Sequence, residues 1–209
     1  ALPILLAVHV QRVAVCQGDF FSHADMAAEN RASLYRSKVK LTGNLNVLTN
    51  KGSYETTAQA DTVAANVGLG PVGVNAAIAR NNTKNYATIV GDREISVDGM
   101  TTVHGKGKAV DTATLTGLTL GFKEVTASTV VALNDADSRT TISTNSLISK
   151  GGFTVDATQD AATTAKVKTG GGSLISGKMN IALAYGRGIL TPNFEGGYAK
   201  IKHMLQALL

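Results

Sequence analysis

The sequence has few of the residues on which metal sites and covalent catalysis depend. It contains no tryptophan and one cysteine, and its four histidines stand far apart at positions 9, 23, 104 and 203. One cysteine excludes an intrachain disulfide, and histidines without paired ligand spacing or a second cysteine predict no zinc site. Cys16 follows the apolar run Val13-Ala14-Val15, which favours a buried thiol over a nucleophile. We therefore expect neither a metal nor another cofactor.

Charged and aromatic residues are also scarce. Charged residues make up 17% and aromatic residues 5% of the chain, whereas average globular proteins are roughly 25% charged. The net charge of +5 is spread along the chain, and its densest groups, Arg36-Ser37-Lys38-Val39-Lys40 and Lys106-Gly107-Lys108, lack aromatic neighbours for base stacking. We expect no specific nucleic-acid binding, although repeated lysines on one face would attract acidic host or cell-surface glycans. No segment reaches membrane-spanning length.

The sequence does contain a degenerate repeat of about 50 to 58 residues. One block recurs at intervals of 50 and 58 residues as Leu45-Asn46-Val47, Ile95-Ser96-Val97 and Phe153-Thr154-Val155. A second recurs at intervals of 53 and 52 residues as Asn75–Ala79, Ser128–Ala132 and Asn180–Ala184. A third comprises Ala32-Ser33-Leu34, Ala87-Thr88-Ile89 and Thr140-Thr141-Ile142. Such a period is typical of solenoids, in which each unit buries its apolar face against its neighbours.

The repeated region has the character of β-strands. All 24 threonines lie at or after Thr42, and runs such as Thr112-Ala113-Thr114-Leu115-Thr116 alternate with the period of 2 expected of strands with one buried face. Asp98-Gly99, Lys150-Gly151-Gly152 and Gly170-Gly171-Gly172 are turn signals between such runs. We predict an all-β fold, a parallel β-helix or β-solenoid over residues 38–191 (about 41–94, 95–151 and 152–191), with two or three coils in each repeat.

Two sets of structural residues follow from this prediction. Asn75, Ser128 and Asn180 recur in register and would form a hydrogen-bonded ladder along the axis, or else face solvent. Near the C-terminus the spacing of apolar residues predicts a short helix within 192–209, which would cap the stack or contact another subunit through Ile201, Met204, Leu205 and Leu208. The N-terminal segment, residues 1–37, holds either a helix start after Ser22 or a partial earlier repeat.

Four patterns resemble functional motifs but are incomplete. Gly68–Gly73 matches G-x-G-x-x-G with a proline inside it, and its counterparts in other repeats are different glycine runs, which indicates a corner. Gly172–Met179 resembles a P-loop whose magnesium-binding hydroxyl is replaced by methionine, and Asn134–Asp137 resembles a calcium loop without its Gly and Glu. Acidic residues with a nearby arginine, as in β-helical pectin-cleaving enzymes, would have to come from Asp98, Asp156, Asp160 and Arg139. We expect no enzymatic activity.

Taken together, Gly43–Val47, Thr57–Ala60, Val67–Asn81 and Thr83–Ile89 resemble the repeats of large bacterial filamentous adhesins of the leukotoxin and haemagglutinin type. The resemblance covers roughly residues 38–191. It implies a right-handed parallel β-helix in a secreted or surface-attached rod that works by reach and adhesion, and it implies no active-site residues.

The expected function is therefore that of a structural or adhesive element of an extracellular filament or cell-surface adhesin, either as part of a longer chain or as a homo-oligomer. The alternative is a phage-type tail fibre or spike that binds or cleaves glycans.

Overall fold

The structure is a computed structural model that describes residues 7–15, 19–49, 55–187, 189–196 and 199–201. These residues form fifteen strands and no helix, so the protein is all-β. The C-terminal helix is not seen: the described residues of 192–209 lie in β14 (Ile189–Gly196) and β15 (Ala199–Ile201). A helical spacing over so few residues is weak because the same apolar residues also suit short strands.

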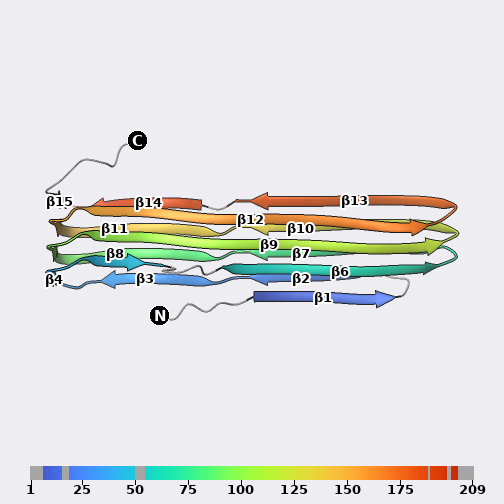
Figure 1. The fold of residues 1–209 in the computed structure, drawn as a ribbon, viewed down its shortest axis with the longest axis horizontal. Coiled ribbons are helices and arrows are strands. Elements are labelled where there is room, and N and C mark those ends of the chain that lie inside the picture. Colours follow the sequence, from blue (N-terminus) through green and yellow to red (C-terminus); the bar gives the residue numbers. More distant parts are fainter. Residues whose placement is uncertain (1–6, 16–18, 50–54, 188, 197–198, 202–209) are drawn as a thin grey trace.

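The strands build three parallel sheets, which we call sheets A, B and C (Figure 1). Sheet A contains β1 (Ala7–Val15), β5 (Leu45–Leu48), β6 (Thr56–Gly68), β9 (Thr101–Gly121) and β12 (Phe153–Gly172). Sheet B contains β2 (Phe20–Met26), β7 (Val72–Asn81), β10 (Lys123–Asn134) and β13 (Ile175–Gly186). Sheet C contains β3 (Glu29–Tyr35), β4 (Val39–Leu41), β8 (Lys84–Val97), β11 (Asp137–Ser149), β14 and β15.

The chain visits sheets A, B and C in turn, and we call each such passage a rung. In Figure 1 the strands of sheet A run in one direction, and the strands of sheets B and C return end to end in the other. Four rungs are described, and they begin with β1, β5, β9 and β12. The stretch predicted as either a helix or a partial repeat forms β2 and β3, which pair with β7 and β8 in the second rung. In the structure this stretch is therefore strand and not the start of a helix.

Each sequence repeat makes one rung, so the prediction of two or three coils per repeat was wrong. Paired Cα positions are 53 residues apart between β7 and β10 and 52 apart between β10 and β13. The strands are longer than expected, with 21 residues in β9 and 20 in β12. Gly170-Gly171-Gly172 was predicted as a turn, but these residues continue β12 in register with β9. Neighbouring rungs are about 4.8 Å apart, so the stack is short while a 21-residue strand extends for about 70 Å.

Two of the three repeat alignments agree with the strand register. Ser128 pairs with Asn75 and Asn180, and Ala87 pairs with Ala32 and Thr140. The remaining alignment, of the segments that begin at Leu45, Ile95 and Phe153, is wrong for its middle segment. Ile95 lies in sheet C and pairs with Val39 and Leu147. The true partner of Leu45 and Phe153 is Thr101 in sheet A. Short alternating triplets look alike in any strand, so three residues do not define a register.

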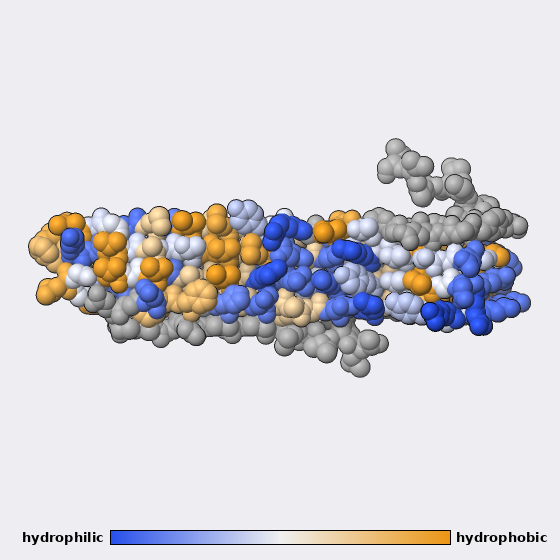
Figure 2. Space-filling view, turned by 180° about the vertical axis from the view of Figure 1, so that it is seen from behind, coloured by the Kyte–Doolittle hydropathy of each residue, from blue (hydrophilic) through white to orange (hydrophobic). Residues whose placement is uncertain are grey.

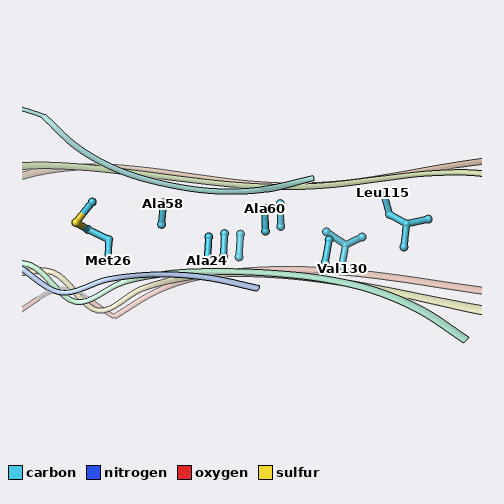
Figure 3. Packing of buried hydrophobic residues seen from close by; sticks show 10 residues of the cluster. Ala24, Met26, Ala58, Ala60, Leu115 and Val130 are labelled. Carbon is cyan, nitrogen blue, oxygen red and sulfur yellow. The ribbon is translucent and has the colours of Figure 1, made fainter. Parts of the chain in front are cut away.

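The core is a thin layer between sheet A on one side and sheets B and C on the other. Between sheets A and B it consists mainly of alanines, with Met26, Leu115 and Val130 as the larger side chains (Figure 3). Between sheets A and C the residues are larger and include Ile89, Ile95 and Ile142. Small side chains allow the two layers to approach closely, which explains how a chain with few aromatic residues fills its interior.

At Gly105 the layers come so close that only glycine fits. A Cβ atom on Gly105 would lie 2.7 Å from the carbonyl oxygen of Arg139 in sheet C. The Gly105 amide donates a hydrogen bond of 2.9 Å to Thr140 Oγ1, and this hydroxyl donates in turn to the Asp156 carbonyl. Gly105 thus fixes the separation between sheets A and C.

Candidate functional site

The predicted ladder residues stack in register but are not joined by hydrogen bonds. Asn75 and Ser128 are buried on β7 and β10, and Asn180 is exposed on β13. Among the hydrogen bonds of the described residues, none links these three side chains. Asn75 Oδ1 has no partner, and Asn180 Nδ2 donates to Thr169 Oγ1 at 2.9 Å.

A different asparagine pair performs the cross-linking role at the corner between sheets B and C. Asn81 and Asn134 are register partners with fully buried side chains. Asn81 Nδ2 donates to the Thr56 carbonyl at 2.9 Å, and Asn134 Nδ2 donates to the Ala109 carbonyl at 3.2 Å. Because Thr56 and Ala109 are also register partners, the second and third rungs make the same bond across the interior. The two asparagines are 53 residues apart, each at the end of an alternating run, and this signal could have been found in the sequence.

Replacing Asn81 with alanine should lower the free energy of unfolding by about 1–3 kcal/mol, because the buried Thr56 carbonyl loses its donor. Thr83 Oγ1 also loses one of its two acceptors, Asn81 Oδ1 at 2.7 Å, and keeps Thr56 Oγ1 at 2.9 Å. Urea denaturation of Asn81→Ala beside the exposed Asn145→Ala would measure the difference. Equal midpoints for the two variants would contradict this role of Asn81.

The lysine of the P-loop-like segment, Lys178, lies at an inward position of β13 and reaches a buried acid. Lys178 Nζ lies 2.7 Å from Glu124 Oε1, and Ser176 Oγ donates to the same oxygen at 2.8 Å. Glu124 is 1% exposed, and its second oxygen has no hydrogen-bond partner. The lysine that would contact phosphate in a nucleotide site instead neutralises a buried carboxylate.

A second buried acid, Asp111, has no cation beside it. It lies on β9 between Ala109 and Ala113 on the inward side, is fully buried, and has no hydrogen-bond partner at either carboxylate oxygen. Burial raises the pKa of Asp111 from 3.8 to about 7, and the Asn134 side chain beside it only partly offsets this effect. The amide of Asn134 donates to the Ala109 carbonyl instead. Asp111 is therefore neutral in mildly acidic solution.

The acidic residues considered for glycan cleavage do not gather at one place. Asp156 and Asp160 lie two outward positions apart on β12, a distance of about 13 Å. Asp156 Oδ2 is 3.4 Å from His104 Nε2. Arg139 lies on sheet C, where it pairs with Asp137 at 2.7 Å. Asp98 lies at a turn, where the hydrogen bond and charge of Lys150 lower its pKa.

The remaining predicted positions are at the C-terminus. Ile201 ends β15 and pairs with Ser149, whereas Met204, Leu205 and Leu208 lie outside the described residues. In the part of the chain that the structure describes, no three acidic, histidine or cysteine side chains are grouped so that they could hold a metal ion. The same part contains no helix that is long and apolar enough to cross a membrane.

These observations define an all-β protein of stacked parallel sheets, compatible with a parallel β-helix. No protein-family model, curated protein or solved structure matches the chain.

Proposed function

We propose that the chain is a segment of a right-handed parallel β-helix. This class is supported by the three-sheet rungs, in which paired residues of neighbouring rungs are 52 and 53 positions apart in the sequence. The right-handed sense is supported by a general rule, because crossovers between parallel strands of one sheet are almost always right-handed.

We further propose that this β-helix is a structural or adhesive element of an extracellular bacterial filament or surface adhesin, and that it has no catalytic role. The observation that carries the proposal is the exposed last rung. In the described residues β13 has a strand partner on one side only, β10, and all its residues are exposed, including the inward-facing Ala182 and Ala184. Such a rung is a template with which the strands of a further rung can pair.

Adhesion to acidic host or cell-surface glycans is part of this proposal. Lys108, Lys166 and Lys168 lie on the outward positions of sheet A, on neighbouring strands. The Lys108 amino group is paired with Glu55 at 2.7 Å, so Lys166 and Lys168 on β12 would provide most of the contacts to a polyanion. Their attraction would fall as salt is added.

Electron microscopy and sedimentation of the purified chain test the proposal. We expect either discrete particles with the dimensions of one stack or of two stacks side by side, or filaments whose length grows with protein concentration. Ala182→Lys, which places a charge at the exposed end of the interior, should shorten such filaments, whereas the outward Thr164→Lys in the same rung should not. A heat-resistant trimer, or cleavage of acidic polysaccharide that is lost in Asp156→Asn or Asp160→Asn, would favour the spike and overturn the proposal.

A further inference from the structure

Exposed apolar side chains are concentrated at one half of the molecule. Of the nineteen large hydrophobic residues exposed in the described part of the chain, all but Tyr35, Met100, Ile189 and Leu190 lie on sheet B, at the adjoining end of sheet A or at the turns between them. Figure 2 shows this apolar half beside a half dominated by polar and charged side chains. An uneven distribution of this kind marks an interaction surface more often than scattered single residues do.

The outer face of sheet B forms the main part of this surface. Its outward positions repeat in register from strand to strand, so apolar residues form rows across the sheet. One row contains Ile78, Val131 and Leu183, and the next contains Phe21, Ala76 and Ile181. We call this surface the B face, and its apolar members are Phe21, Val72, Val74, Ala76, Ile78, Val125, Ala127, Val131, Leu133, Met179, Ile181, Leu183 and Tyr185.

The charged residues around the B face lie at its ends. Where sheet B meets sheet C, Asp135 accepts hydrogen bonds from Arg80 at 3.3 Å and Arg187 at 2.9 Å. Lys123 lies at the opposite end, next to the turn from sheet A. The rows between these ends contain His23 and Thr129 as polar members, and Asp19 accepts a hydrogen bond of 2.8 Å from the Val74 amide at the edge of the face next to β2. This is the arrangement of an interface, an apolar centre with a polar rim.

The properties of the B face fit another flat sheet better than a peptide or a lipid surface. The backbone groups of β7 and β10 are already paired on both sides, so the centre of the face offers no edge to an added strand. No cluster of basic side chains lies among the apolar rows to attract anionic lipid. Two sheets, by contrast, pack face to face about 10 Å apart through side chains of this kind.

We propose that two copies of the chain pair through their B faces. Five outward positions on four strands cover roughly 600 Å², so two faces would bury about 1,200 Å², which is the lower limit for a specific stable interface. The apolar residues at the adjoining turns, Leu69, Phe122 and Leu174, extend this area. The pairing is lateral and leaves the ends of each stack free, so it does not depend on adhesion or on end-to-end growth.

Val131→Lys tests the pairing by placing a charge at the centre of the B face. Sedimentation equilibrium of the wild-type chain should show a reversible dimer, and the variant should dissociate at least tenfold more readily. Val90→Lys is the matched control, because Val90 is an outward, half-buried valine on sheet C. Leu183→Lys places a second charge on the B face, on the last strand β13, which has a neighbouring strand on one side only. Circular dichroism confirms folding of each variant.

Loss of the dimer in Val131→Lys and Leu183→Lys, with retention in Val90→Lys, would support the pairing. A wild-type chain that stays monomeric up to high micromolar concentration, or a dimer that survives both B-face variants, would overturn it. Filaments that persist in these variants as single rather than double stacks would leave the proposed filament function intact while still supporting lateral pairing.

Discussion

Asp111→Asn should stabilise the protein at pH 8 and have little effect near pH 4. The pKa of Asp111 is about 7 in the folded protein, against an ordinary value of 3.8. Between these values the folded state holds a proton that the unfolded state releases, so the stability of the wild type falls as the pH rises. The difference corresponds to about 4 kcal/mol at most, reached above pH 7. The neutral asparagine amide has the shape of the protonated acid and does not ionise, so the variant does not lose this stability as the pH rises.

Urea titrations of wild type and Asp111→Asn at several pH values between 4 and 8 would measure the effect. The difference between their free energies of unfolding isolates Asp111 from the other carboxylates, whose contributions are common to both proteins. Asp160→Asn, which changes an exposed aspartate on β12, is the matched control and should show no comparable trend. A wild type and Asp111→Asn that remain equally stable at pH 8 would show that water or a structural adjustment solvates the carboxylate.

Lys178→Met should lower the free energy of unfolding by about 3 kcal/mol, because it leaves the Glu124 carboxylate buried without its cation. The lysine side chain is 24% exposed and the glutamate side chain is fully buried, so the loss affects the glutamate most. The double variant Glu124→Gln/Lys178→Met should recover most of the stability, because it removes both charges together. Thermal or urea unfolding of the two variants measures both effects.

Lys168→Met is the control for the loss of a positive charge alone, because Lys168 is an outward lysine on β12. If Lys178→Met is no less stable than Lys168→Met, the ion pair contributes nothing in the interior. If the double variant is less stable than Lys178→Met, the glutamine must lack a hydrogen-bond partner that the carboxylate has.

The parallel stacking could be predicted because the repeat itself encodes which segments lie side by side. The Asn75 and Ala87 blocks gave the correct strand partners, since each aligned segment lies in the same sheet in successive rungs. The number of coils per repeat could not be read in the same way. Glycine marks both a turn and a close approach of two backbones, and two glycines lie within long strands for the second reason. At Gly105 the close neighbour is Arg139 of sheet C, and at Gly171 it is the Thr119 carbonyl on the adjacent strand of sheet A.

The buried acids were within reach of the sequence but were missed. Asp111 alternates in step with Ala109, Ala113 and Leu115, and this spacing places it on the inward side of β9. Outward aspartates such as Asp160 differ from Asp111 only in that they occupy the alternate positions of their strand, whose side chains face away from the interior. What the sequence could not predict is which inward acid would find a cation, because Glu124 and Lys178 lie on different rungs and meet only through the register of β10 and β13.

The flattened shape of each rung has a mechanical consequence. The hydrogen bonds between neighbouring strands point from rung to rung, so a load that separates the rungs acts directly on these bonds. A rung of 52 residues advances the stack by about 4.8 Å, yet the same residues pulled straight would reach roughly 170–190 Å. Each rung that peels away therefore lengthens the chain by more than thirty times its folded height. Under tension such a stack would act as an extensible tether that yields one rung at a time before the chain is fully stretched.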